Sequence, residues 1–301
     1  NVSKSLSIVR KASMAVSDDE RWAATLDLSG ELSVLDIERV VTGNVVATGW
    51  GLLDCVAVSD DGQQVAWGGN DGFTISHSED WVARRTFRRA VSGGAAIHNL
   101  QFSATGHRLL SAGAFSADHP ILWDTHTGDI IKEFRDRPGT IPTLIADGRQ
   151  LLVAGESGLI RLDVDTGNEI SRFETEIVPR DRSKESFLES LGADRVLVSP
   201  DERYAVTLRN PIVRWNLTDG HVMSIKHEVN ASAVCGAWSE DGKRFAAGFS
   251  NGVIQLWDAD RGHVLGIGTG HQGLVTALAF NRDGTRLASS GDMSIRIWDP
   301  S

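Results

Sequence analysis

The C-terminal segment Gly270–Asp299 reads GHQGLVTALAFNRDGTRLASSGDMSIRIWD and decides the fold. An apolar run over 274–280 is followed by Asp283-Gly284 and by a second short run over 286–290. Asp-Gly between two apolar runs is typical of a hairpin turn. A third stretch over 294–298 alternates polar and apolar side chains, which is the period of a half-buried strand. The segment therefore predicts three short strands joined by two tight turns.

The same unit recurs along the whole chain in less regular copies. The turn between its first and second strands can be aligned seven times, and the second turn residue advances by 42, 44, 42, 54, 40 and 42 positions. This period suits a four-stranded propeller blade better than a helical repeat of about 33 or 34 residues. The seven turns are Asp19-Glu20, Asp61-Gly62, Thr105-Gly106, Asp147-Gly148, Asp201-Glu202, Asp241-Gly242 and Asp283-Gly284.

The last unit begins with Gly270-His271 and ends with Trp298-Asp299, and in this it resembles the WD40-repeat family. The resemblance implies an all-β fold, a seven-bladed WD40-type β-propeller of four-stranded antiparallel blades. It also implies a hydrogen-bonded structural tetrad of His271, Ser289, Asp292 and Trp298. The Trp of the third strand recurs as Trp123, Trp215 and Trp257, whereas Leu35, His77 and Leu162 are expected at this position in the other blades.

We expect a single β-propeller domain over residues 1–301. By analogy with the family, residues 1–7 supply the outer strand of the last blade and so close the ring. The long step in the repeat places extra residues within 174–193, which we expect to form an exposed loop, or a short amphipathic helix over 183–191. The expected blades are approximately 11–50, 51–90, 91–135, 136–173, 174–225, 226–270 and 271–301 together with 1–7.

Composition limits the classes of partner. The formal net charge of −10 argues against nucleic acid, because phosphate binding needs a basic surface. No run approaches the length of about 18 apolar residues that a membrane span needs, so no membrane contact is expected. Cys55 and Cys235 lie in comparable apolar positions and are expected to be reduced, buried thiols, which favours a cytoplasmic location. A basic run is interpreted as a charged edge strand or as a site for an acidic partner; it comprises Arg84, Arg85, Arg88 and Arg89.

Catalytic motifs are missing from the sequence. It has no HExxH, CxxC, GxSxG or GxxxxGK[ST] pattern, and its His residues are scattered singly. We therefore expect no enzymatic activity, no cofactor and no metal.

A binding surface is expected on one face of the propeller. In the family, the connections between blades and those between the second and third strands share the face called the top. The residue just inside each first strand points at the mouth of the central channel. Two carboxylates and a His in this rim could receive a Lys, an Arg or an amino terminus, although a hydrated rim is the alternative. The aligned rim residues are Ala12, Asp54, His98, Thr140, Asp194, Val234 and Thr276.

Aromatic and basic residues extend this predicted surface. Trp50 enters the second blade and could cap the channel, pack between blades or form an exposed anchor. The connection 112–120 is longer than a hairpin needs, and extra loop length often carries function. The predicted partner-binding residues of the top face are Trp50, Asp54, His98, Phe115, His119, Arg180, Arg182 and Asp194.

The expected function is a non-enzymatic scaffold or sensor domain that binds a protein or peptide at this face. The regular last repeat is similar to repeats in bacterial multidomain signalling proteins, and the chain begins at Asn1, so we expect it to be part of a larger protein. Two alternatives stay open. One is an enzyme with a metal held in the channel by Asp54, His98 and Asp194. The other is a structural module that self-associates through its edges.

Overall fold

The structure is a computed structural model, and all of its elements are β-strands within the residues that it describes. The predicted all-β class is confirmed. The chain divides into two compact units, unit 1 with residues 1–150 and 164–167, and unit 2 with residues 151–163 and 168–301. The described residues are 11–17, 21–27, 31–36, 41–47, 53–69, 72–77, 83–88, 97, 99–113, 119–136, 142–154, 158–174, 196–208, 211–225, 227, 229–292 and 294–300.

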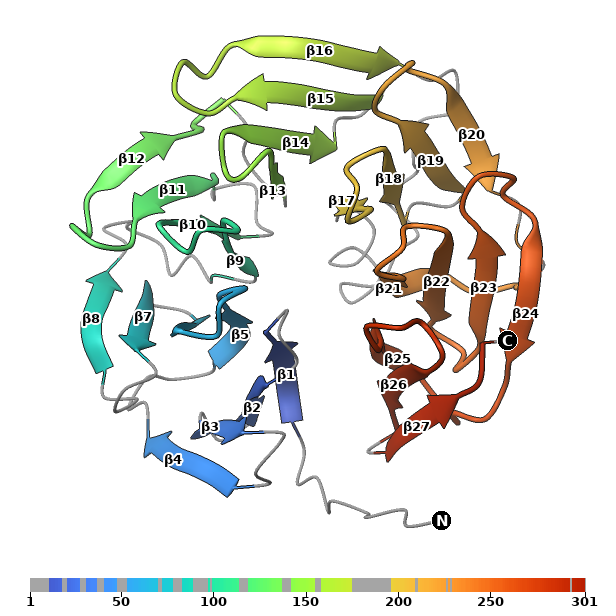
Figure 1. Ribbon diagram of the computed structural model, residues 1–301, viewed down its shortest axis with the longest axis horizontal. Coiled ribbons are helices and arrows are strands. Elements are labelled where there is room, and N and C mark those ends of the chain that lie inside the picture. The colour runs from blue at the N-terminus through green and yellow to red at the C-terminus, as the bar shows by residue number, and fades with distance from the viewer. Residues whose placement is uncertain are drawn as a thin grey trace. The chain divides into compact units, whose positions relative to one another are not determined.

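Unit 1 holds three four-stranded antiparallel sheets in which each strand pairs with the next one along the chain (Figure 1). The first sheet is β1 (Lys11–Val16), β2 (Trp22–Asp27), β3 (Glu31–Asp36) and β4 (Val41–Ala47). The second is β5 (Leu53–Val58), β6 (Gln64–Gly69), β7 (Gly72–His77) and β8 (Ala83–Arg88). The third is β9 (Asn99–Phe102), β10 (Arg108–Ala112), β11 (Ile121–Asp124) and β12 (Ile130–Glu133).

The fourth sheet has the same order, with β13 (Thr143–Ile145), β14 (Gln150–Ala154), β15 (Gly158–Asp163) and β16 (Glu169–Glu174). Unit 2 holds β17 (Val196–Val198), β18 (Tyr204–Thr207), β19 (Ile212–Asn216) and β20 (Val222–Ile225). The next sheet is β21 (Ala233–Trp238), β22 (Arg244–Phe249), β23 (Ile254–Asp258) and β24 (Val264–Gly268). The last sheet has three strands, β25 (Val275–Phe280), β26 (Leu287–Gly291) and β27 (Ser294–Trp298).

These sheets fall where the seven repeats were predicted, and the three strands expected within 270–299 are confirmed. The predicted outer strand of the last sheet, residues 1–7, lies outside the described residues. Residues 175–193 of the predicted insertion 174–193 also lie outside the described residues. The basic run begins on β8, the outer strand of the second sheet, as expected for Arg84, Arg85 and Arg88.

Strand register corrects one position of the predicted Trp column. In three sheets the third-strand Trp pairs with the second residue of the second strand, for example Trp123 with Leu109 and Trp257 with Phe245. In the second sheet that partner is Val65, and it pairs with Ser76 rather than His77. The tight hairpin that pairs Gly69 with Gly72 fixes this register. Ser76 is buried and His77 is half-buried, so the core position holds a hydroxyl.

Three of the turns between first and second strands share one construction. In the second sheet Ser59 donates from Oγ to Asp61 Oδ1 at 2.6 Å and accepts from the Gln64 N–H at 2.9 Å. The same pair of bonds recurs in the turns that begin at Ser199 and Ser239. The fourth turn residue adopts a left-handed backbone conformation, with φ of 65° at Gly62. A short polar motif therefore fixes these three turns.

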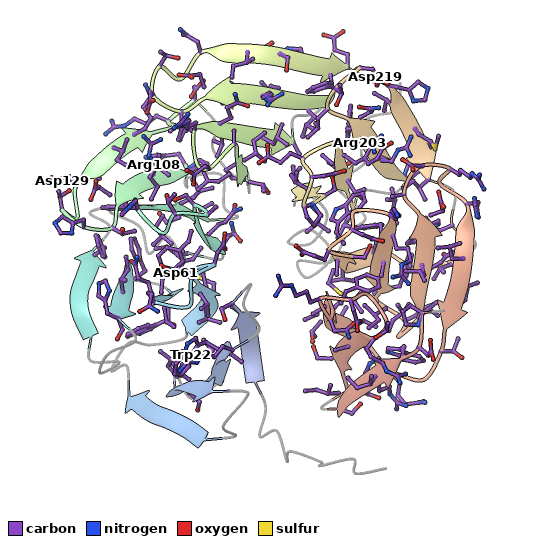
Figure 2. The ribbon with its side chains drawn as sticks, in the orientation of Figure 1. Trp22, Asp61, Arg108, Asp129, Arg203 and Asp219 are labelled. Atoms are coloured by element: carbon purple, nitrogen blue, oxygen red, sulfur yellow. The ribbon has the colours of Figure 1, made fainter. Side chains whose placement is uncertain are left out.

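The first residue of some second strands, directly after the turn, donates a side-chain hydrogen bond to the equivalent turn of the following sheet. Gln64 Nε2 donates to the Gly106 carbonyl at 3.1 Å, and Arg108 donates to the Gly148 carbonyl at 2.9 Å. Arg244 does the same to the Gly284 carbonyl at 2.8 Å. Figure 2 labels Trp22, Asp61 and Arg108, which belong to the first three sheets. We call these contacts the bottom latches.

Apolar side chains fill the space between neighbouring sheets of each unit. In unit 1, Phe73 stacks on Phe87 with ring centroids 4.4 Å apart, and Trp123 meets Phe73 edge-on at 5.3 Å. In unit 2, Tyr204 of the fifth sheet stacks on Trp238 of the sixth sheet with ring centroids 6.4 Å apart. Offset and edge-on aromatic pairs pack densely and favour one orientation of the rings. Neighbouring sheets are therefore held together by core contacts as well as by the bottom latches.

Candidate functional site

The last sheet shows how the top of a blade is held. Trp298 Nε1 donates to Ser289 Oγ at 2.8 Å, and His271 Nε2 lies 2.7 Å from the same hydroxyl. His271 Nδ1 lies 2.5 Å from Asp292 Oδ1. An indole N–H and an imidazole can be buried at low cost only if they are hydrogen-bonded. His271 lies in the connection before β25. Its hydrogen bonds join this connection to Ser289 on β26 and to Asp292 in the turn between β26 and β27, and Trp298 on β27 bonds to the same Ser289.

Asp292 carries the charge of this network. Hydrogen bonding from His271 lowers the pKa of the Asp292 carboxyl, and further bonds from the Gln272 N–H and from Ser294 act in the same direction. The Gln272 N–H lies 2.9 Å from Asp292 Oδ2. The carboxylate is therefore the form that fixes the backbone beside the top-face connection.

Other sheets keep only part of this network. Trp123 Nε1 donates to Ser111 Oγ at 2.9 Å, and Trp215 Nε1 donates to Thr207 Oγ1 at 3.3 Å. In the sixth sheet Ala247 takes the place of the hydroxyl residue, and the buried Trp257 Nε1 has no hydrogen-bond partner. The top of the sixth sheet therefore lacks the polar tie that holds the top of the last sheet.

First strands in both units share an irregularity at their top ends. The pairing with the second strand shifts register between Lys11 and Ser13, Leu53 and Cys55, Ala233 and Cys235, and Val275 and Ala277. Each shift leaves one residue out of the ladder, as in a β-bulge, and a bulge redirects the side chain that it carries. The residues left out are Ala12, Asp54, Val234 and Thr276, which are rim positions that the repeat alignment selected.

Thr276 shows the surroundings of one rim position in detail. Its side chain is exposed, and its Oγ1 lies 2.7 Å from Ser290 Oγ on the neighbouring strand. The two hydroxyls face solvent as one small donor and acceptor group. Val234, at the same position of the sixth sheet, is half-buried. The rim is thus polar at the last sheet and apolar at the sixth.

His119 is the predicted partner-binding residue whose side chain the structure describes. The side chain is half-buried, and its Nε2 lies 3.4 Å from Glu133 Oε2 on the outer strand β12. Arg135 Nε donates to the same oxygen at 2.5 Å, which lowers the pKa of the Glu133 carboxyl. His119 is therefore engaged with an outer strand of its own sheet.

The other predicted site residues stay predictions. Asp54 lies on β5, but its side chain is outside the description. The alternative metal site of Asp54, His98 and Asp194 is likewise untested. Residues entirely outside the described part are Trp50, His98, Phe115, Arg180, Arg182 and Asp194.

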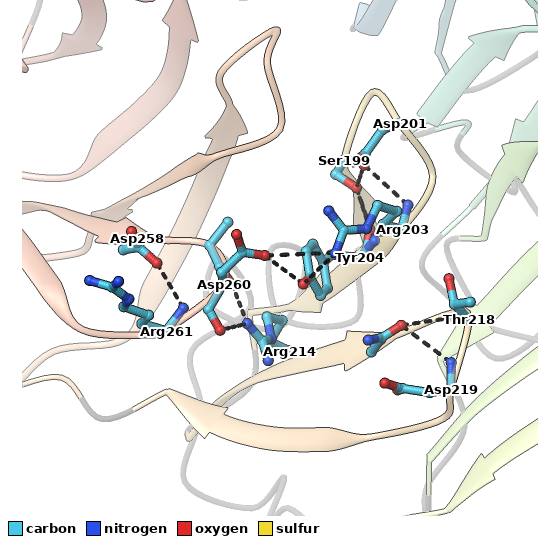
Figure 3. Close-up of polar contacts among 12 residues, drawn as sticks. Ser199, Asp201, Arg203, Tyr204, Arg214, Thr218, Asp219, Asp258, Asp260 and Arg261 are labelled. Atoms are coloured by element: carbon cyan, nitrogen blue, oxygen red, sulfur yellow. Dashed lines mark hydrogen bonds and ion pairs between the residues drawn. The ribbon is translucent and has the colours of Figure 1, made fainter.

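A polar cluster at the bottom of the fifth and sixth sheets escaped the sequence analysis (Figure 3). Tyr204 Oη donates to Asp260 Oδ1 at 2.7 Å, which raises the pKa of the Tyr204 hydroxyl. The buried Arg214 guanidinium lies 4.7 Å from the centroid of the Tyr204 ring and donates to the Ala259 carbonyl. Arg203 covers the same ring at 5.1 Å. The sequence signal was a charged residue inside the apolar strand 212–215, directly before Trp215.

Among the described residues there is no group of three or more His, Cys, Asp or Glu residues that could hold a metal ion. Cys55 Sγ donates to the Ile97 carbonyl at 3.3 Å, and Cys235 Sγ donates to the Val275 carbonyl at 3.2 Å. Within the same part of the chain, no helix is long and apolar enough to span a bilayer.

Comparison with known proteins supports the fold. The family model for the WD40 domain, described as "WD domain, G-beta repeat", matches residues 217–258 and 262–299. Autophagy-related protein 16 of Arabidopsis thaliana is 27% identical over 230 residues, which cover 74% of this chain and 41% of that protein. The chain spans less than half the length of several curated relatives that it matches.

Two solved structures are similar over 99% of this chain and 99% of their own length. One is the Cps50 (Swd1) β-propeller domain of Myceliophteria thermophila, with a TM-score of 0.78 and 15% identity. The other is hydrazine synthase of Kuenenia stuttgartiensis, with a TM-score of 0.76 and 12% identity. At these identities the likeness concerns the fold alone. Taken with the sheet order, it shows that the chain has a β-propeller fold, in which residues 217–258 and 262–299 match the WD40 repeat.

Proposed function

We propose that this chain is a non-enzymatic scaffold that binds a protein or peptide through the top face of its propeller. WD40 propellers generally bind proteins, and the shared irregularity of the first strands supports a specific place for the binding. The same register shift occurs at the same position in four first strands, two of them in each unit. Bulges are frequent next to functional sites, where they aim a side chain away from the ladder.

The chemistry of the rim positions favours a basic partner group. Asp54 occupies the bulged position of β5, and Asp194 is the aligned residue of the fifth repeat. A carboxylate forms short, charge-assisted hydrogen bonds with Lys, Arg or an amino terminus. The net charge of −10 would also attract a basic partner over a longer range at low ionic strength.

Aromatic and basic residues of the connections complete the proposed surface. Trp50 and Phe115 are the candidate anchors, because large aromatic side chains often contribute most of the binding free energy. Arg180 and Arg182 lie in the insertion, where added chain length can carry specificity. We further propose that the domain works as a sensor within a longer cytoplasmic protein.

The proposal is tested by affinity capture from an extract of the source cells with four forms of the chain, namely wild type, two rim variants and a control. The rim variants carry Asp54→Asn or Asp194→Asn, each of which removes a charge and keeps the side-chain shape. The matched control is Glu240→Gln, which makes the same chemical change at an exposed position of a bottom turn. Circular dichroism and thermal unfolding establish that every form is folded.

We expect wild type and Glu240→Gln to retain the same partner and at least one rim variant to lose it. A partner that all forms retain equally would place the binding away from the rim and contradict the proposal. Adding Trp50→Ala then separates an anchor role from core packing. As an anchor its loss lowers affinity without changing thermal stability, whereas as a core residue its loss lowers stability.

A further inference from the structure

The outer strand of the sixth sheet, β24, has an exposed edge with apolar and no charged side chains. Val264, Leu265 and Ile267 are 40%, 46% and 54% exposed, which makes this the densest group of exposed large apolar side chains on one described strand. β24 stands at the end of its sheet, after β23. An edge strand offers unpaired backbone N–H and C=O groups to another strand. Exposed apolar side chains beside such groups often mark a contact surface.

Other outer strands with described side chains protect their edges. β16 reads EISRFE and has an exposed Ile170 between charged residues, and β12 reads IIKE and ends in Lys132 and Glu133. β20 is uncharged, but its Ile225 is buried and Ser224 is its exposed residue. β24 reads VLGIG and carries neither a charge nor a proline. It lacks the features that usually prevent edge-to-edge pairing.

The sequence of β24 is complementary to itself in an antiparallel pair. With a two-fold axis at Gly266, Leu265 of one copy lies opposite Ile267 of the other, on one face of the ladder. On the other face Val264 lies opposite Gly268, and Gly266 lies opposite its own copy. Directly opposed apolar side chains stabilise an antiparallel pair. The same operation on β16 would place Glu169 opposite Glu174, and like charges in direct opposition are destabilising.

We propose that β24 is a self-association edge, which joins two copies of this chain by antiparallel strand pairing about Gly266. Such a contact is isologous, because the same surface is used by both copies. A contact confined to one strand buries less than the roughly 1,200 Å² of stable complexes, so the dimer is weak and forms at high protein concentration. The contact lies on the outer strand and is independent of the proposed top-face binding.

The first test measures the mass of the full chain in solution by sedimentation equilibrium, from about 1 µM to about 1 mM. Wild type should rise from the monomer mass toward twice that mass, and Ile267→Lys should remain a monomer throughout. The matched control is Ile170→Lys, which adds the same charge at an isoleucine that is 48% exposed on the outer strand β16. This control should dimerise like wild type.

Two outcomes of this test would overturn the proposal. A wild-type chain that stays monomeric over the whole range has no self-association edge. A dimer that survives Ile267→Lys but is lost in Ile297→Lys, at an isoleucine 63% exposed on β27, would place the contact on the last sheet. Since Ile267 is exposed, Ile267→Lys should leave the thermal unfolding temperature unchanged, and this checks that the variant is folded.

A second test uses the two-fold axis itself. A Cβ added at Gly266 would meet no atom within 4 Å, so Gly266→Cys fits the chain. Opposed residues in an antiparallel pair have Cα atoms about 4.5–5.5 Å apart, which a disulfide can bridge. Mild oxidation should convert Gly266→Cys to a disulfide-linked dimer, whereas wild type and Ile170→Cys should stay uncrosslinked. If Ile170→Cys crosslinks as fast as Gly266→Cys, then random collision explains both and the proposed register is wrong.

Discussion

At the scale of single residues, the tetrad of the last sheet links stability to pH. Hydrogen bonds from His271, Gln272 and Ser294 favour the charged form of Asp292 and lower its pKa below 3.8, the ordinary value for Asp. A carboxyl whose pKa is lower in the folded state binds protons more readily when unfolded. Its stabilising contribution is therefore fully present above the unfolded pKa and is lost as the pH falls toward the folded pKa.

We predict that the stability difference between wild type and Asp292→Asn shrinks as the pH falls from 6 toward 3. Urea unfolding at both pH values measures it. The variant should have the lower urea midpoint at pH 6, and the two midpoints should approach each other at pH 3. A difference that is unchanged or larger at pH 3 would show that the carboxylate charge of Asp292 does not stabilise the fold.

A second prediction at this scale concerns the missing hydroxyl of the sixth sheet. Trp257 Nε1 is buried without a partner, and Ala247 stands where Ser111 and Ser289 accept the indole N–H in other sheets. Ala247→Ser should raise the free energy of unfolding by about 0.5–1.5 kcal/mol, as for one added buried hydrogen bond. Chemical denaturation followed by Trp fluorescence measures this change.

Ala247→Cys is the control, because it adds a side-chain atom that is only a weak acceptor. It should give little or none of the gain. Equal stabilisation by Ser and Cys would attribute the effect to packing rather than to the indole hydrogen bond. In the third sheet, Ser111→Ala should have the opposite effect and cost about 1–3 kcal/mol, because Trp123 loses its partner.

At the scale of the element, the bottom turn of the fifth sheet departs from its equivalents. Glu202 has a φ of 53°, and Gly62 and Gly242 have 65° at the same turn position. A left-handed conformation costs a non-glycine residue about 1–2 kcal/mol. Glycine avoids this cost, but its greater conformational freedom in the unfolded chain offsets part of the gain in stability. Glu202→Gly should therefore raise the free energy of unfolding by about 0.5–1 kcal/mol.

Thermal and urea unfolding of Glu202→Gly and Glu202→Ala decide this prediction. Both variants remove the same side chain, but only glycine relieves the backbone. The Ala variant should not gain stability. If Ala stabilises as much as Gly, the Glu202 side chain is unfavourable for another reason and the turn is not strained.

Elements also show what could be predicted from sequence. The seven turns and four Trp positions placed the strands because local turn chemistry and a period of about 42 residues are written directly in the chain. Alignment on these turns also selected Ala12, Asp54, Val234 and Thr276, which the structure places at strand irregularities. The misplaced His77 shows the limit, since this hairpin differs in length between sheets, and a difference of one residue moves the core position to the neighbouring residue.

Contacts between repeats were beyond the reach of sequence reasoning. Tyr204 and Asp260 are 56 residues apart and belong to different sheets, so no local pattern joins them. The bottom latches were missed for the same reason, because Gln64, Arg108 and Arg244 read as ordinary polar residues at the start of a strand. The anchors Trp50 and Phe115 and the insertion residues Arg180 and Arg182 remain sequence predictions.

At the scale of the whole molecule, the repeated sheets and the hydrogen bonds between their turns support the proposed role as a binding platform. The described bottom turns are held by latches and buried polar contacts, and the last sheet is tied at its top by the tetrad. Rigid scaffolds carry binding residues on the connections between their elements. The account therefore assigns recognition to the top-face connections and fold stability to the bottom turns.

Hydrogen–deuterium exchange of the chain, with and without its captured partner, tests this assignment most directly. The account predicts slower exchange on binding in the top-face segments, including 50–58 with the rim residue Asp54 and 269–277 with Thr276. Exchange should be unchanged in the bottom turns 59–64 and 239–244. Protection confined to those turns or to β24, with none at the top-face segments, would contradict the central claim that the top face binds the partner.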